Sequence, residues 1–123
     1  MARNVSTSDA MASIDQFRAD SDNTDALAQA VRLSLGWFAS AHPGRAVELR
    51  VPPYGAVQIL EGTTHRRGTP SAVVEMSPAT WIALFTHATT WEAACASGQV
   101  LASGARSDLT EPLTSTPYGV SNA

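Results

Sequence analysis

The chain has 123 residues and a mass of 12.9 kDa, which is enough for one domain with a single hydrophobic core. Only 15% of the residues are charged, the formal net charge is -3, and all 8 residues counted as Lys or Arg are arginine. The absence of lysine excludes a Walker-type phosphate loop and a lysine Schiff base. The negative net charge argues against a protein that binds nucleic acid by neutralising phosphates.

Cysteine content and hydropathy narrow the cellular setting. With Cys95 as its single cysteine, the chain has no internal disulfide and no multi-cysteine zinc site, which fits a reducing cytoplasm. No run of about 18 apolar residues predicts a membrane span. The first residues lack the basic start and the continuous apolar stretch of a signal peptide. We therefore expect a cytoplasmic protein with no stable membrane insertion.

The first half of the chain begins with helical patterns. Residues 1–23 are rich in Ser, Asp and Ala, and they fit either a short, weakly formed helix or a flexible segment. A clear amphipathic pattern starts at Asn23 or Thr24, both of which are helix-capping residue types, and ends at the His-Pro-Gly sequence of 42–44. The apolar face of this predicted helix consists of Leu27, Val31, Leu35 and Phe38.

Strand patterns follow. Val47, Leu49 and Val51 alternate with polar residues, which is typical of a half-buried strand. Further strands are predicted at 55–61, 72–76 and 99–103.

Short helices are predicted around the last of these strands. One begins at Ser77-Pro78, with serine as the cap and proline in the first position. The next begins at Thr89 or Thr90, where Thr89-x-x-Glu92 fits a capping box, and a brief final helix runs from about 107 to 113.

The order of these elements predicts the fold class. Strands that are grouped, and do not alternate with helices, indicate an α+β fold with an antiparallel sheet and helices on one face. We expect one domain over residues 24–114, preceded by the flexible or weakly helical segment 1–23 and followed by a loose tail, 115–123.

The sequence lacks the common catalytic signatures: it contains no GxSxG, HExxH, GxGxxG or Cys-x-x-Cys motif. Glu61-x-x-x-His65 combines two residue types that bind metals or transfer protons, but no second histidine lies at metal-ligand spacing from His65. We therefore expect no metal, no cofactor and no enzymatic activity. Cys95 lies in Ala-Ala-Cys-Ala, where we expect a packed and unreactive thiol.

Residues 76–91 form a long window without a charged side chain. A surface helix normally has a charged face, whereas the polar side of this window offers only Ala, Thr and His. Two interpretations are open: the window is covered by its own domain or by a second subunit, or it forms one wall of an apolar ligand cavity. Its large apolar residues are Met76, Trp81, Ile82, Leu84, Phe85 and Trp91.

The segment 61–70 is dense in polar residues and contains two glycines before its final proline. Arg66 and Arg67, next to His65, are suited to receive a carboxylate or a phosphate through forked hydrogen bonds. The alternative is a solvated turn, or internal salt bridges with Glu48, Glu61 or Asp108.

The stretch SPATWIALFTHATTWEAACASGQVLASGARSDLTEPL, which follows the strand at 72–76, resembles the C-terminal signature of the sterol carrier protein type 2 family. In that family a strand leads into a helix, a turn, a second short helix, a strand bounded by glycines and a final helix. Gly98 and Gly104 bound the corresponding strand here. RAVELRVPPYGAVQILEG, HRRGTP and ASGARSDL are similar to a compact actinobacterial sterol-carrier-like branch, and the likeness spans about residues 27–113.

The resemblance implies an antiparallel sheet of about five strands, covered by helices, around a hydrophobic tunnel for fatty-acyl or sterol-like ligands. Together with the uncharged window, it identifies as candidate ligand-binding residues Val57, Ile59, Met76, Trp81, Leu84, Phe85 and Trp91. The candidates for a polar head group are Arg50, His65, Arg67 and Arg106.

Two functions follow as hypotheses. The first is a non-catalytic carrier of a fatty-acyl or other lipid-like metabolite, bound between the sheet and the helices. The second is an interaction module that uses the uncharged helix pair to form a homodimer or to dock on a partner. In that case the side chains of Trp81 and Trp91, which are large, would fill the cavity.

Overall fold

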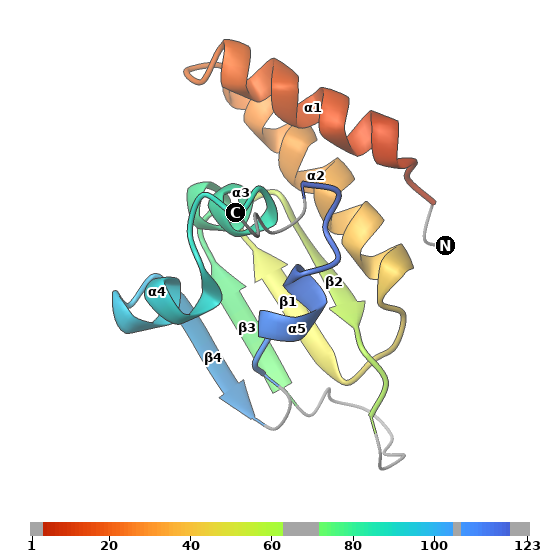
Figure 1. Ribbon diagram of the computed structural model, residues 1–123, viewed down its shortest axis with the longest axis vertical. Coiled ribbons are helices and arrows are strands. Elements are labelled where there is room, and N and C mark those ends of the chain that lie inside the picture. Colours follow the sequence, from red (N-terminus) through yellow and green to blue (C-terminus); the bar gives the residue numbers. More distant parts are fainter. Residues whose placement is uncertain (1–3, 63–71, 105–106, 119–123) are drawn as a thin grey trace, which may run out of the picture.

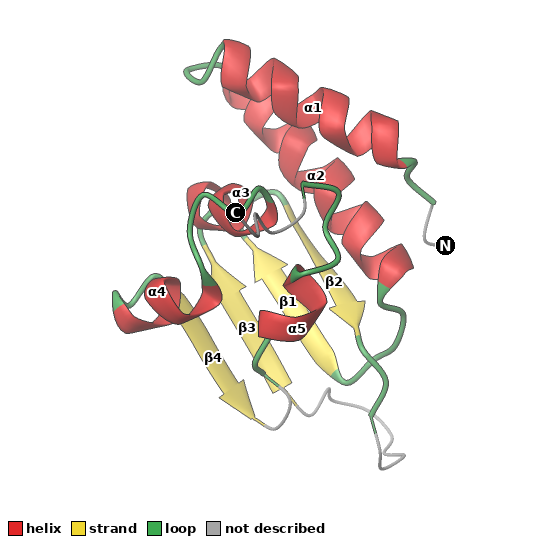
Figure 2. Cartoon of the chain, in the orientation of Figure 1, coloured by secondary structure: helices red, strands yellow, loops and turns green. Residues whose placement is uncertain are grey.

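A mixed β-sheet with helices packed against one face organises the chain (Figures 1 and 2). The computed structural model describes residues 4–62, 72–104 and 107–118. The α-helices in these residues are α1 (Thr7–Ala19), α2 (Thr24–Ala41), α3 (Pro78–Phe85), α4 (Trp91–Ala96) and α5 (Thr110–Leu113). The strands are β1 (Val47–Val51), β2 (Gly55–Ile59), β3 (Ala72–Met76) and β4 (Val100–Gly104). The predicted α+β class is confirmed.

The strands of the sheet lie in the order β2-β1-β3-β4. β1 and β2 form an antiparallel hairpin, and β3 and β4 are also antiparallel. The central pair, β1 and β3, is parallel, with Val47 opposite Ala72. The predicted antiparallel sheet of about five strands is therefore corrected in two details: the described residues form four strands, and the central pair is parallel.

The parallel pair follows from where each strand starts and ends. β2 ends at Ile59, opposite Val47 at the beginning of β1. The chain has thus returned to the end of the sheet at which β1 began. β3 starts at that same end, on the other side of β1, and so it runs in the same direction as β1. Apolar alternation identifies a strand, but it does not specify which strand becomes its neighbour.

Helix α2 has the predicted bounds. Asn23 caps it, because the side-chain oxygen accepts a hydrogen bond from the Ala26 amide at 3.0 Å. Of the predicted apolar face, Leu27 is half-buried against the core, and the fully or nearly fully buried members are Val31, Leu35 and Phe38.

Helix α3 also begins as predicted. Ser77 is its cap and accepts a hydrogen bond from the Thr80 amide at 3.2 Å, and Pro78 lies in the first turn, where its missing N–H costs no hydrogen bond. The Ser-Pro pair was therefore a reliable start signal.

The last two helices begin at or near their predicted starts. The cap of α4 is Thr90, which accepts a hydrogen bond from the Ala93 amide at 3.0 Å. One of the two predicted starts, Thr90, is therefore confirmed, whereas the predicted capping box with Thr89 as the cap is wrong by one residue. Helix α5 begins only at Thr110, after Asp108 has accepted hydrogen bonds from both the amide and the hydroxyl of Thr110, at 2.9 and 2.6 Å.

The N-terminal segment contains helix α1, which lies alongside α2 (Figure 1). Ile14 of α1 is fully buried between the two helices, and the Trp37 indole of α2 donates a hydrogen bond to the Thr7 hydroxyl at 2.9 Å. Gly36 permits this close approach, since a Cβ at that position would lie 2.8 Å from Cγ2 of Val5. Helix α1 is thus part of the packed structure.

The two faces of the sheet have different surroundings. On the helix side, Val47, Leu49 and Val51 of β1 are fully buried. The outer side carries Arg50, which is exposed, and Leu101, whose 68% exposure makes it the exposed large hydrophobic residue among those that the structure describes. Any site built from the core therefore lies between the sheet and the helices.

Candidate functional site

The structure brings all seven candidate ligand-binding residues into one apolar layer between the sheet and the helices. Five are buried in the hydrophobic core, and two, Val57 and Trp91, are half-buried and packed against it. The buried five are Ile59, Met76, Trp81, Leu84 and Phe85. We call this set of seven the apolar layer.

Ring contacts fill the centre of the apolar layer. The Trp81 ring lies 5.3 Å from Phe38 and 5.6 Å from Phe85, measured between centroids. Phe85 in turn contacts Trp37 at 5.7 Å and Tyr118 at 6.1 Å, both close to edge-to-face. These separations are those of favourable aromatic pairs, so the side chains of α2, α3 and the C-terminal segment pack directly against one another.

One buried hydrogen bond orients Trp81. Its indole nitrogen donates to the Ser34 hydroxyl at 2.8 Å, and that hydroxyl donates to the Ala30 carbonyl at 2.6 Å. Both Trp81 and Ser34 are fully buried, so water does not satisfy the indole N–H in their place. The pair therefore joins α3 to α2 across the apolar layer.

The C-terminal segment crosses the same region and is attached through two histidines. Nε2 of His42, at the end of α2, lies 2.6 Å from the Ser115 hydroxyl, and Nε2 of His87, after α3, lies 2.9 Å from the Thr116 hydroxyl. Tyr118 then packs on Phe85. We call residues 115–118 the C-terminal strap. The sequence placed these residues in a loose tail, and no periodicity or motif marked Tyr118 as a contact of the core.

Burial shifts the pKa values of two side chains at the strap. The pKa of His42 is lowered, mainly by burial and against a smaller raising effect of a hydrogen bond with the Pro112 carbonyl. The pKa of Tyr118 is raised, mainly by burial and then by the charge of Asp15, while Arg18 acts in the opposite direction. The Tyr118 hydroxyl therefore stays protonated at neutral pH.

The candidate head-group residues lie elsewhere or outside the described chain. Arg50 projects from the outer face of the sheet, away from the apolar layer, and forms ion pairs with Glu48 at 2.9 Å and Glu75 at 3.9 Å. These carboxylates raise its pKa, the hydrogen bond with Glu48 being the largest cause. His65, Arg67 and Arg106 lie outside the described residues, as does most of the polar segment 61–70.

The other residue types that the sequence singled out are possible metal ligands and Cys95. In residues 4–62, 72–104 and 107–118, no three His, Cys, Asp or Glu side chains are grouped so as to hold a metal ion. Cys95 is exposed, so the predicted packing of its thiol is wrong; its neighbour Ala94 is the buried residue of α4. Partial burial and then Asp108 raise the pKa of Cys95, which keeps the thiol protonated.

None of the described helices has the length and apolar character of a membrane span.

A surface depression of about 540 Å³ lies where α1 turns into α2. Its lining is mostly polar and includes none of the seven residues of the apolar layer. Because apolar ligands bind in sites lined mainly by aliphatic and aromatic groups, this depression does not extend the candidate site. The lining residues are Gln16, Asn23, Asp25, Ala26 and Gln29.

The fold and the apolar layer define a small α+β domain whose core lies between one face of a sheet and a set of helices. A family model described as a bacterial SCP ortholog matches residues 23–114. The chain therefore belongs to this family of sterol-carrier-protein-like domains, and the resemblance found in the sequence is confirmed. A comparison with individual curated proteins finds no match.

The family match covers the apolar layer but not two other segments that pack on the domain. All seven residues of the apolar layer lie within residues 23–114. Helix α1 and the C-terminal strap lie outside that range, although both pack on the matched domain. They are features of this chain that the family match does not describe.

We expect Ser34→Ala to destabilise the protein by roughly 1–3 kcal/mol, because it leaves the buried Trp81 indole N–H without an acceptor. Urea unfolding followed by tryptophan fluorescence measures the change. Ser40→Ala is the matched control: Ser40 is on the same helix, but its bond to Asn4 is exposed and 3.3 Å long, so a change within about 0.5 kcal/mol is expected. Equal effects of the two variants would contradict the role of Ser34.

The lowered pKa of His42 predicts a loss of stability in mild acid. Above the ordinary histidine pKa of about 6.5, the imidazole is neutral in both the folded and the unfolded chain. As the pH falls below that value, the unfolded chain binds the proton first, so the folded state loses stability. We expect the urea midpoint to fall between neutral pH and about pH 5, and to fall less in His42→Gln.

The control for this experiment is Ser115→Ala, which removes the hydrogen-bond partner of His42 but no titrating group. It should lower stability while keeping the wild-type dependence on pH. An identical pH dependence in wild type and His42→Gln would show that His42 does not contribute to it.

Proposed function

We propose that this protein binds and carries a ligand with a long apolar chain, such as a fatty-acyl compound or a similar lipid-like metabolite. Membership of a sterol-carrier-protein-like family supports lipid binding or carrying in general. The observation that carries the proposal for this chain is the gathering of all seven candidate residues in one apolar layer. They come from β2, β3, α3 and α4, so the layer joins both sides of the domain.

In this proposal the ligand enters the apolar layer by displacing side chains that otherwise fill it. Trp81 and Phe85 are fully buried and in contact with each other, whereas Val57 and Trp91 are only half-buried. The two half-buried side chains belong to elements at opposite edges of the layer, β2 and α4. Fewer packing contacts are lost when a partly exposed side chain moves, so the ligand enters most easily from such an edge.

A non-catalytic role fits the chemistry of the described residues. Of the two residues whose types suit proton transfer, Glu61 is exposed and His65 lies outside the described chain. Binding here depends on apolar contact and needs no proton transfer, metal or cofactor.

The alternative function, docking through the uncharged helix pair, is less well supported. The feature that motivated it was the run of large apolar residues in α3, and the structure buries Trp81, Ile82 and Phe85 within their own domain. Those side chains are then not available to a second subunit unless α3 leaves the core.

Titration with octanoate, decanoate and dodecanoate tests the carrier function, with tryptophan fluorescence as the readout. Each buried CH₂ contributes about 0.8 kcal/mol, so every two added methylenes should tighten binding by roughly tenfold. The fluorescence should change on saturation, because Trp81 and Trp91 belong to the apolar layer.

Leu101→Ala is the control for contact with the outer face, because Leu101 is exposed on the opposite side of the sheet. Its affinities should match those of the wild type. If affinity does not depend on chain length, or if Leu101→Ala abolishes binding, the ligand does not occupy the apolar layer and the proposed function fails.

A further inference from the structure

The hydroxyl of Tyr118 is the buried side-chain polar atom that has no hydrogen-bond partner among the described residues. Such a group costs free energy, because it has lost its hydrogen bonds to water and gained none from the protein. Other polar side chains in the same region do have hydrogen-bond partners, namely Trp81, Ser34 and Thr116, so the missing partner is particular to Tyr118. An orphaned donor at the end of a packed aromatic ring therefore needs its own explanation.

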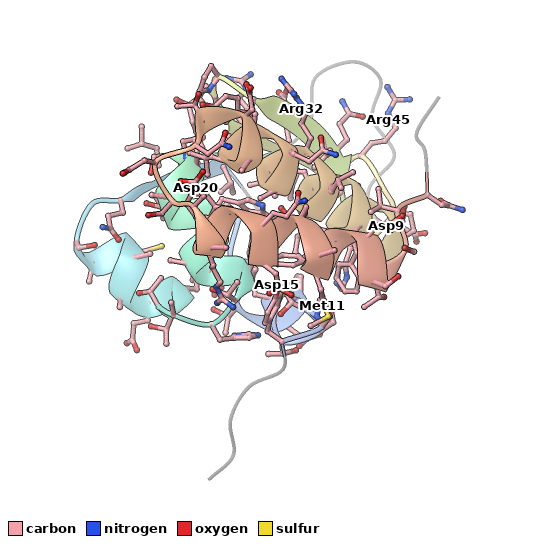
Figure 3. The ribbon with its side chains drawn as sticks, turned by 90° about the horizontal axis from the view of Figure 1, so that it is seen from above. Asp9, Met11, Asp15, Asp20, Arg32 and Arg45 are labelled. Carbon is pink, nitrogen blue, oxygen red and sulfur yellow. The ribbon has the colours of Figure 1, made fainter. Side chains whose placement is uncertain are left out.

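A cation lies over the ring that carries this hydroxyl. The guanidinium carbon of Arg18, on α1, is 5.3 Å from the centre of the Tyr118 ring. The ion pairs found in the described chain are those of Arg50, and Arg18 forms none there. Asp15, one turn earlier on α1, also acts on Tyr118, so the site has one charge of each sign. Figure 3 shows Asp15 projecting from α1 on the side where the C-terminal segment lies.

The position of Tyr118 connects it to the apolar layer. Its ring contacts Phe85, a member of the layer, at 6.1 Å, and the strap that carries it is fixed by His42 and His87 through consecutive residues. An apolar chain lying along Phe85 would therefore have its polar end next to Tyr118.

We propose that the Tyr118 hydroxyl and the Arg18 guanidinium bind the carboxylate of a fatty acid whose chain occupies the apolar layer. This inference rests on the proposed function and adds the head-group chemistry to it. The neutral hydroxyl donates one hydrogen bond to a carboxylate oxygen, and the guanidinium supplies further donors and the compensating positive charge. The raised pKa of Tyr118 keeps its proton in place for this donation.

The proposed site favours a carboxylate over a neutral head group. An ester carbonyl accepts the hydrogen bond of Tyr118, but it gains nothing from the charge of Arg18. A carboxylate gains from both, and hydrogen bonds to charged groups are stronger than those between neutral groups. The negative charge of Asp15 acts against the ligand, so Arg18 is the residue that makes an anion acceptable.

The experiment compares dodecanoate with methyl dodecanoate on the full-length wild type, Tyr118→Phe and Arg18→Gln. We expect the wild type to bind the acid more tightly than the ester. Tyr118→Phe should weaken binding of the acid by roughly tenfold to a hundredfold, and Arg18→Gln should weaken it by a similar factor. Binding of the ester should change little in Arg18→Gln.

Stability measurements separate ligand binding from a structural role. Because Tyr118→Phe removes an unpaired buried hydroxyl and keeps the ring on Phe85, the urea midpoint of the free protein should stay the same or rise. A residue that only stabilised the fold would show the opposite pattern. Tyr54→Phe is the matched control, because Tyr54 also lies beside an arginine, Arg32 at 6.0 Å, and should leave both affinities unchanged.

The outcomes distinguish this inference from the proposed function. If the wild type binds acid and ester equally, or if Tyr118→Phe retains the affinity for the acid, the head-group site is wrong while chain binding stands. If neither ligand binds, or if affinity for the fatty acids shows no dependence on chain length, the carrier function itself is wrong, and the head-group site fails with it.

Discussion

The Trp81 indole on α3 is fully buried, and its nitrogen donates a hydrogen bond to the Ser34 hydroxyl on α2. A buried indole N–H without an acceptor is costly, so this bond restricts how α3 can lie on α2. Once α3 is fixed, Phe85, one turn further along the same helix, meets Trp37 of α2 and Tyr118 of the strap. The placement of α3 on α2 thus depends on one polar contact within the apolar layer, and the C-terminal strap is then attached to these helices through His42 and His87.

Sequence patterns predicted the elements that local physics determines. Helix α2 has a polar cap at Asn23, an apolar face with helical spacing and a Pro-Gly stop, and all three are properties of nearby residues. The order of the strands in the sheet, by contrast, is not determined by nearby residues. β3 pairs with β1 because β2 ends at the end of the sheet where β1 began. The alternation within Ala72–Met76 contains no information about that neighbour. The parallel pairing of β1 with β3 could therefore not be predicted from sequence patterns.

The candidate site was predicted in the same uneven way. Large apolar residues in an uncharged window must be buried somewhere, so the gathering of Trp81, Leu84 and Phe85 could be foreseen. The direction of Arg50 could also have been deduced, because it alternates with Leu49 and Val51, which face the core. Tyr118 had no such signal: it is a single aromatic residue in a polar tail, and only the folded chain places it on Phe85.

The division between matched and unmatched segments bears on what family membership can predict. The apolar layer lies entirely within residues 23–114, the range that the family model matches. Arg18 and Tyr118 come from α1 and the strap, on either side of that range, and they meet only because both segments pack on the same edge of the domain. Membership of the family therefore bears on the proposed binding of an apolar chain, whereas the proposed head-group site depends on segments of this chain that lie outside the matched range.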